Sequence, residues 1–188
     1  MSFISSIGTA NPKHSIKQTE VVDFMIQAHG LNEQEAHDLK VLYRATGIEQ
    51  RYTTIPDYSK TRGFDFFPDN EKLEPFPSTK KRGDWYRKHA LGLSEQAVKN
   101  CLNEKIEKEK ITHLITVSCT GMNAPGLDIE LVECLGLNRN VERTAINFMG
   151  CYAAFNAIKV ANHICKSQDA NVLIVCVELC TLHFQKNK

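Results

Sequence analysis

The chain has 188 residues, enough for one ordinary domain with a sizeable hydrophobic core. Its 23 basic and 22 acidic residues nearly balance, so the composition gives no reason to expect nucleic acid or an anionic membrane as a partner. No apolar run approaches the length of a membrane span, and the first residues lack the pattern of a signal peptide. Seven cysteines without a Cys-x-x-Cys pair indicate reduced thiols, and therefore a cytoplasmic protein.

The first third of the chain is predicted to contain a short strand and two helices. The apolar stretch Phe3–Ile7 predicts the strand, and a turn-rich sequence follows it. Apolar residues at helical spacing predict a helix over Glu20–His29 that Thr19 caps. The cap signal Asn32–Glu35 predicts a second helix that continues through Tyr43.

The middle of the chain has no clear period until the next helix. Proline and glycine interrupt the segment Thr53–Pro77, which predicts an excursion over the surface. The basic cluster Lys80–Arg82 is interpreted as a solvated patch, because the balanced net charge gives little support to a nucleic-acid site. A helix is predicted over Asp84–Leu102, and the charged run Asn103–Lys110 is predicted to be its solvated end.

Strands and helices alternate in the second half of the chain. The predicted strands are Ile111–Ser118, Val141–Phe148 and Asn171–Glu178, and the predicted helices between them are Asp128–Leu135 and Cys151–Lys166. Such alternation is typical of βαβ units and a parallel sheet. Continuous apolar strands favour a sheet that helices cover on both faces. The sequence therefore predicts an α/β fold.

Cys151 follows Gly150 at the point where a predicted strand gives way to a long apolar helix. A thiol in the first helical turn lies near the positive end of the macrodipole, which favours thiolate over thiol. This is a suitable place for a nucleophile. The alternative is a structural role, because free cysteine is among the most buried residue types and often only fills space.

The residues around Cys151 carry a resemblance to a known family. The run Asn147–Ala161 and the strand Val172–Glu178 resemble the active-site region of chalcone synthase-like type III polyketide synthases. Departures from the plant pattern at pocket positions favour the bacterial branch. The resemblance extends from Ile4 to about Phe184, and its further motifs are Ile-Gly-Thr-Ala-Asn-Pro near the start, His113-Leu114-Ile115, Thr120-Gly121, Pro125-Gly126-x-Asp128 and Leu135-Gly136-Leu137.

The resemblance implies a thiolase-like fold. In that fold two similar βαβαβ halves pack about a pseudo-twofold axis, with the helix of the nucleophile between them. Residues 1–188 would be the N-terminal half, with helices on both faces of a mainly parallel sheet and with the nucleophilic cysteine. The catalytic histidine and asparagine of the family lie in the C-terminal half, which is absent from this chain.

The activity that the resemblance implies is an iterative decarboxylative condensation. An acyl-CoA starter would form a thioester with Cys151, malonyl-CoA units would extend it, and the product would cyclise. Coenzyme A thioesters are the expected substrates, with no further cofactor, in a homodimer. The alternative enzyme is a ketoacyl synthase or another thiolase-superfamily condensing enzyme, which would depend on an acyl-carrier protein. The alternative outside catalysis is a half-length fragment or interaction subunit.

The resemblance also assigns residues to the substrate pocket. These are Cys119, Thr120, Ala124, Glu178, Cys180 and His183. In the family, a residue at the Ala124 position reaches the site of the partner subunit, and plant members often carry methionine there. Plant members tend to have threonine at the positions of Cys180 and His183. A plant-like starter or product is therefore not implied.

Two smaller groups of residues have an open interpretation. Lys40 and Arg44 lie four residues apart on one helix face and could bind the phosphates of coenzyme A, as basic residues of this region do in the family; otherwise they are a solvated pair. Cys176, Cys180 and His183 raise the question of a metal site. Histidine stands where a cysteine triplet would have its third ligand, so packing is preferred and no metal is predicted.

Overall fold

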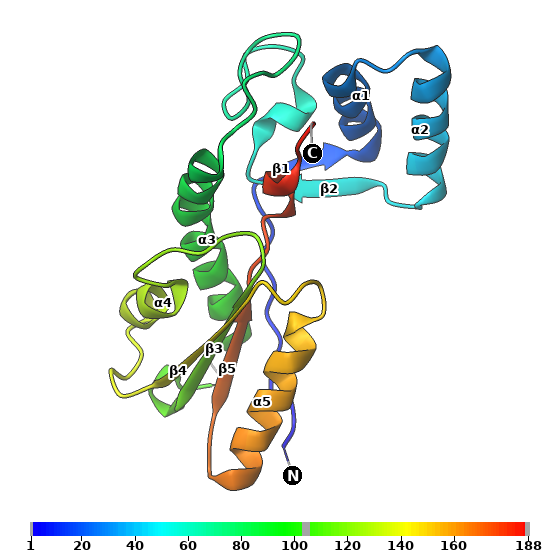
Figure 1. Ribbon diagram of the computed structural model, residues 1–188. Coiled ribbons are helices and arrows are strands. Elements are labelled where there is room, and N and C mark those ends of the chain that lie inside the picture. The colour runs from blue at the N-terminus through cyan, green and yellow to red at the C-terminus, as the bar shows by residue number, and fades with distance from the viewer. Residues whose placement is uncertain (1, 103–105, 187–188) are drawn as a thin grey trace. The chain divides into compact units, whose positions relative to one another are not determined.

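The computed structural model describes residues 2–102 and 106–186 (Figure 1). The chain divides into two compact units. We call Met1–Ala10 with Gly83–Leu179 the sheet unit, and Asn11–Arg82 with Cys180–Lys188 the helical unit. None of the helices in the described ranges is both long enough and apolar enough to cross a membrane.

The sheet unit is built on three parallel strands. β3 (His113–Ser118) is central, with β4 (Glu142–Asn147) on one side and β5 (Val172–Cys176) on the other. α4 (Leu127–Leu135) connects β3 to β4, and α5 (Ala153–Ser167) connects β4 to β5. The predicted α/β class and the parallel βαβαβ order of a thiolase-like half are therefore confirmed.

Helices lie on both faces of this sheet (Figure 1). On one face, Ile115 belongs to the same buried cluster as Ala157 of α5. On the other, Tyr86 of α3 (Thr79–Leu102) donates its hydroxyl hydrogen to Ser118 Oγ over 2.8 Å. β3 is buried along its whole length, whereas β4 is largely exposed. The full burial that the apolar runs predict is thus confirmed for the central strand, whereas β5 is only partly buried and ends at the exposed Cys176.

Several helix boundaries differ from the predicted ones. α5 begins at Ala153 rather than at Cys151, because Tyr152 has φ −102° and ψ 5° and so is not helical. α3 begins at Thr79, so Asp84 lies inside the helix and does not cap it. A residue of a capping type marks the start of a helix where its side chain accepts a hydrogen bond from a backbone N–H of the first turn.

The N-terminal segment is not the predicted strand. Within the described ranges, Phe3–Ile7 pairs with no other strand. Instead, Ser6 Oγ donates to the Cys101 carbonyl over 2.6 Å. Gly8 packs so closely against α3 that an added Cβ would lie 2.2 Å from the Cys101 nitrogen. The segment is therefore held to α3 by side-chain hydrogen bonds and a close backbone approach, and not by pairing with a strand.

The charged run Asn103–Lys110 lies partly outside the described residues, at positions 103–105. Its last residues form the short 3-10 helix η3 (Lys108–Lys110). Lys108 Nζ donates to the carbonyl of Leu135 at the end of α4, over 2.9 Å. Residues 107–110 are exposed, as predicted, but they form a separate short helix tied to α4 and not the end of α3.

The helical unit contains a two-stranded antiparallel sheet and two helices. β1 (His14–Lys17) pairs with β2 (Gln50–Thr53), and α1 (Gln18–His29) and α2 (Glu33–Ala45) lie between them in the chain. α1 begins at Gln18, so Thr19 is inside the helix and is not its cap.

The predicted capping box at the start of α2 is confirmed. The Glu35 N–H donates to Asn32 Oδ1 over 3.0 Å, and the Asn32 N–H donates to Glu35 Oε2 over 2.9 Å. Both contacts satisfy N–H groups that have no partner within the helix. Local chemistry therefore fixed the start of this helix correctly.

The segment Thr53–Pro77 is not a surface excursion; it folds around Asp57. The Asp57 carboxylate is fully buried and accepts hydrogen bonds from the N–H groups of Asp65, Phe66 and Phe67, each over 2.8 Å. Three donors compensate for the burial of one negative charge. An arrangement of this kind has no period in the sequence, so the prediction was wrong here.

Aromatic rings fill the space beside Asp57. Tyr58, from the 3-10 helix η1 (Pro56–Ser59), lies 4.8 Å from Phe24 and 6.3 Å from Phe184, measured between ring centroids. Phe67 lies 5.6 Å from Phe24 and 5.8 Å from Phe184. The segment therefore contributes much of the apolar core of the helical unit.

Candidate active site

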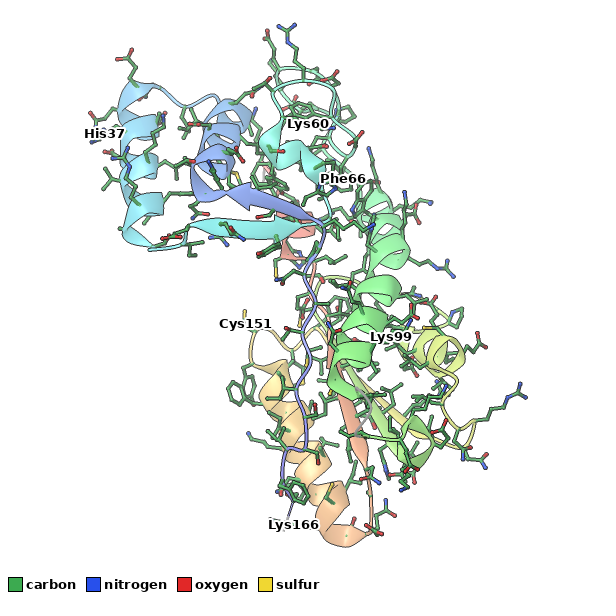
Figure 2. The ribbon with its side chains drawn as sticks, turned by 180° about the vertical axis from the view of Figure 1, so that it is seen from behind. His37, Lys60, Phe66, Lys99, Cys151 and Lys166 are labelled. Carbon is green, nitrogen blue, oxygen red and sulfur yellow. The ribbon has the colours of Figure 1, made fainter. Side chains whose placement is uncertain are left out.

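The loops that follow the three parallel strands meet at one edge of the sheet. Cys119 follows β3, Gly150 and Cys151 follow β4, and Glu178 follows β5. Figure 2 shows Cys151 in the loop that leads into α5, with Lys166 at the opposite end of that helix. Ligands of open α/β sheets bind at the carboxyl ends of the strands. This edge is therefore the candidate active site.

Cys151 lies in a tight turn ahead of α5. The Ala153 N–H donates to the Gly150 carbonyl over 3.1 Å, and the dihedral angles of Tyr152 are those of the third residue of a type I turn. The exposed thiol thus precedes the first helical residue. The prediction of a thiol in the first helical turn is wrong, and the macrodipole argument weakens because that effect falls off within one turn.

The backbone before Cys151 is held in an unusual conformation. Phe148 has φ 56° and Gly150 has φ 81°, both in the left-handed region. Glycine adopts this region at no steric cost, but a residue with a Cβ loses roughly 1–2 kcal/mol there. The Phe148 N–H donates to the Ser118 carbonyl over 3.1 Å, which extends the β3–β4 pairing into the loop.

The side chain of Cys119 contacts both polar backbone groups of Gly150. The Gly150 N–H donates to Cys119 Sγ over 3.2 Å, and the thiol donates to the Gly150 carbonyl at 3.6 Å. The same carbonyl accepts the Ala153 N–H, so both of its lone pairs are engaged. Cys119 thus touches the residue directly before the candidate nucleophile.

The loop after β3 also contacts the end of β5. The Cys119 N–H donates to Glu178 Oε1 over 2.8 Å, and the Leu179 N–H donates to Thr120 Oγ1 over 2.9 Å. Three of the predicted pocket residues, Cys119, Thr120 and Glu178, are therefore brought together with the turn of Cys151.

Sequence reasoning missed the contribution of Tyr86. Its ring lies under the loop after β3, where a Cβ added to Gly121 would be 2.2 Å from Tyr86 Cγ. Burial raises the pKa of the Tyr86 phenol, and the hydrogen bond to Ser118 opposes that shift. The Thr120-Gly121 step was the available signal for this close approach.

Ala124 lies in the same loop and is exposed. Asn123 Nδ2 donates to the Pro125 carbonyl over 2.7 Å and so braces the loop around it. The contact that the resemblance implies between Ala124 and a partner subunit stays a prediction.

Cys180 and His183 belong to the helical unit, where they lie at the two ends of the 3-10 helix η4 (Cys180–His183) and are exposed. Thr181 fixes this helix: its carbonyl accepts the Tyr58 hydroxyl over 2.7 Å, and its Oγ1 lies 2.8 Å from Thr53 Oγ1. Thr181, which stands between these two predicted pocket residues, is therefore held by contacts within that unit.

No metal-binding cluster of three His, Cys, Asp or Glu side chains is found within residues 2–102 and 106–186. Cys176, one of the candidates, ends β5, and burial followed by the charge of Glu178 raises the pKa of its thiol. A raised thiol pKa disfavours the thiolate that a metal ion would need.

Lys40 and Arg44 lie on α2, none of whose side chains is buried. Lys40 Nζ lies 3.4 Å from Asp23 Oδ1, and both groups are solvent-accessible. Surface ion pairs of this kind are weak, so the amine remains available to an anionic ligand.

The chain matches a family model over residues 1–188, that of the N-terminal domain of chalcone and stilbene synthases. Among curated proteins it is similar to "Probable polyketide synthase 1" of Dictyostelium discoideum, with 29% identity over 186 residues. That alignment covers 97% of this chain and 6% of the relative.

Two solved structures have the same fold. One is the C-terminal type III polyketide synthase domain of "Steely1", a type I/III hybrid from Dictyostelium, with a TM-score of 0.87 and 27% identity over 99% of this chain and 50% of that one. The other is PKS-I from the brown alga Ectocarpus siliculosus, with a TM-score of 0.87 and 32% identity over 98% of this chain and 50% of that one.

The chain thus spans about half the length of these solved relatives. Similar proteins come from Dictyostelium, a brown alga and, at 27% identity over 97% of this chain and 45% of the relative, Mycobacterium tuberculosis, so the leaning toward bacterial members stays a prediction. The family predicted from the residues around Cys151 is confirmed. The protein belongs to the chalcone and stilbene synthase family, whose N-terminal domain it matches throughout its length.

Proposed function

We propose that the protein acts in type III polyketide synthesis, with Cys151 as the residue that carries the growing chain. The observation that carries this proposal is the position of the thiol. Cys151 is exposed and follows a parallel strand at the carboxyl end of that strand. It stands in a turn in which the Cys119 side chain contacts Gly150, the residue directly before it. The names of the relatives, which are polyketide synthases, support the reaction class.

The proposed reaction has two steps. In the first, the Cys151 thiolate attacks the carbonyl carbon of an acyl-CoA, the bond to the coenzyme A sulfur breaks, and an acyl-cysteine thioester forms. In the second, malonyl-CoA loses CO2 and the resulting enolate attacks the acyl carbon. The cysteine thiolate leaves, and a chain longer by two carbons remains on coenzyme A. Repetition and cyclisation would follow.

Further groups are needed for these steps. We propose that a second half of the protein supplies the histidine that takes the thiol proton and, with an asparagine, the donors that stabilise the enolate. We also propose that the protein forms a homodimer. Its proposed substrates are coenzyme A thioesters, with no other cofactor. Lys40 and Arg44 are proposed to bind the coenzyme A phosphates.

Acylation followed by intact-mass measurement tests the central claim. The full-length protein is incubated with hexanoyl-CoA, alone and with malonyl-CoA. Wild type is expected to gain one hexanoyl group, Cys151→Ala none, and the control Cys165→Ala one. An adduct that persists in Cys151→Ala would place the nucleophile elsewhere. Extension that requires a malonyl-carrier protein would instead favour a ketoacyl synthase.

The proposed contact between Arg44 and the coenzyme A phosphates is tested by comparing two thioester substrates. Arg44→Ala is expected to raise KM for hexanoyl-CoA, while leaving KM for the N-acetylcysteamine thioester, which lacks the phosphates, unchanged. A rise with both substrates would contradict a phosphate contact.

A further inference from the structure

We infer that Cys119 is a positioning residue for the nucleophile, because its thiol holds the peptide groups on both sides of Gly150 and thereby fixes the direction in which Cys151 points. The inference rests on the proposed function, since it takes Cys151 as the group that attacks the acyl-CoA. Cys119 Sγ accepts the Gly150 N–H at 3.2 Å and donates to the Gly150 carbonyl at 3.6 Å. The two contacts are to the peptide groups on either side of the Gly150 Cα, so together they restrict φ and ψ of Gly150 in a way that a single contact would not.

The turn requires such support because its backbone is strained. Phe148 occupies the left-handed region, which a bulky side chain adopts only where the surrounding structure imposes it. Two successive residues of β3 and its loop supply the restraint: the Ser118 carbonyl accepts the Phe148 N–H, and Cys119 Sγ accepts the Gly150 N–H. Without the second contact, the backbone around Gly150 would be free to relax.

Cys119 is itself well anchored. It directly follows the fully buried strand β3, and its own N–H donates to Glu178 Oε1 over 2.8 Å. Its neighbour Thr120 accepts the Leu179 N–H over 2.9 Å. The loop that bears the Cys119 thiol is thus fixed from the β5 side, and the thiol transmits that fixed position to the turn that follows β4.

Two other roles for Cys119 make different predictions. A residue that only forms the wall of the substrate pocket would change KM or the product, and would leave the Gly150 amide unaffected. A second nucleophile would itself carry an acyl group. A positioning residue changes the rate at which bound acyl-CoA reacts, since small displacements of the attacking atom cost up to about a hundredfold in rate.

The test compares Cys119→Ala with Cys119→Ser in the full-length protein. Alanine removes both contacts to Gly150, whereas serine keeps a donor and an acceptor at the same place. Cys165→Ala is the matched control, because the Cys165 thiol donates to the Ala170 carbonyl at 3.6 Å elsewhere in the sheet unit. Hydrogen exchange at the Gly150 amide and the rate of Cys151 acylation by saturating hexanoyl-CoA are measured for each variant.

For Cys119→Ala, faster exchange at Gly150 and an acylation rate lower by about tenfold to a hundredfold are expected, with the half-saturating concentration unchanged. Cys119→Ser is expected to restore most of both, and Cys165→Ala to change neither. Unchanged exchange and acylation in Cys119→Ala, while Cys151→Ala abolishes acylation, would overturn the inference and leave the proposed function standing. Acylation that survives in Cys151→Ala would overturn the proposed function itself.

If Cys119→Ala does not fold, Cys119→Ser alone tests the inference. Slow acylation in Cys119→Ser together with unchanged protection of the Gly150 amide would contradict positioning. Loss of protection in proportion to the lost rate would support it.

Discussion

The ring of Tyr86 and the backbone of Gly121 are in closer contact than any side chain at position 121 would allow. A Cβ there would lie 2.2 Å from Cγ of the ring and 2.4 Å from Cδ1. The ring cannot easily retreat, because Tyr86 is buried and its hydroxyl donates to Ser118. The loop that carries Cys119 and Thr120 is therefore seated directly on α3.

Gly121→Ala is accordingly expected to displace this loop. Forcing a methyl group into a packed contact costs about 1–3 kcal/mol in the free energy of unfolding. Urea unfolding would measure that loss, and Cys151 acylation should slow with it. The matched control is Gly92→Ala on α3, the helix that carries Tyr86, where an added Cβ meets nothing within 4 Å. That variant should be as stable as wild type or more stable by up to about 1 kcal/mol, and equal losses in both would contradict the steric explanation.

Asp57→Ala is expected to destabilise the helical unit strongly. Removal of the carboxylate leaves the N–H groups of Asp65, Phe66 and Phe67 without their acceptor. Unsatisfied buried donors cost about 1–3 kcal/mol each, so a total loss of about 3 kcal/mol or more is expected on urea unfolding. The control, Asp65→Asn, breaks only the exposed ion pair with Lys60 and should change nothing measurable. A tolerated Asp57→Ala would show that the segment does not depend on this carboxylate.

Tyr58 makes the free energy of unfolding of the helical unit depend on pH in the alkaline range. Burial, followed by the charge of Asp57, raises the pKa of the Tyr58 phenol well above its usual value of 10.0. The folded state therefore keeps a proton that the unfolded chain loses near pH 10, so this contribution is complete below pH 10 and is lost as the pH rises toward the folded-state pKa.

Tyr58→Phe removes that dependence. At neutral pH it should cost about 1 kcal/mol, because the hydrogen bond to the Thr181 carbonyl is lost. Above about pH 10 its free energy of unfolding should fall less steeply than that of wild type, as followed by urea unfolding at several pH values. Tyr52→Phe, at an exposed tyrosine, controls for the loss of a hydroxyl. Parallel curves for wild type and Tyr58→Phe would contradict the assignment.

The apolar residues of α5 predict that the 188-residue chain associates with itself. Phe155 and Ile158 are 62% and 45% exposed, and Phe148 before the helix is 61% exposed. Large exposed apolar side chains drive association where they form a contiguous surface. Sedimentation velocity should show oligomers for the wild-type chain and a smaller species for Phe155→Ser combined with Ile158→Ser. Lys166→Ser, at the far end of the helix, should behave as wild type, and a monomeric wild-type chain would refute the prediction.

The sequence was most informative where local chemistry decides the structure. The capping box of Asn32 and Glu35 involves only neighbours in the chain, so it was predictable, and its two hydrogen bonds are present. The alternation of β3, α4, β4, α5 and β5 was predictable for the same reason. β3, α4, α5 and β5 each carry their own apolar period or continuous apolar run.

The contacts that shape the site could not be predicted in this way, because they join distant residues. The Cys119 thiol and Gly150 are 31 residues apart, and the sequence placed Cys119 only as part of a pocket wall. Asp57 gathers donors eight to ten residues further along a segment without any period. The N-terminal run Phe3–Ile7 has the composition of a strand and yet pairs with none among the described residues, since pairing needs a partner edge that composition does not reveal.

The strand order β4-β3-β5 bears on how the protein is assembled as it is synthesised. The central strand leaves the ribosome first, so β4 can add to one side of it and β5 to the other without displacing a strand already paired. Glu178 and Leu179, which fasten the Cys119–Thr120 loop, come directly after the last strand. The turn of the candidate nucleophile can therefore form early, but its support is complete only when the end of this domain has been made.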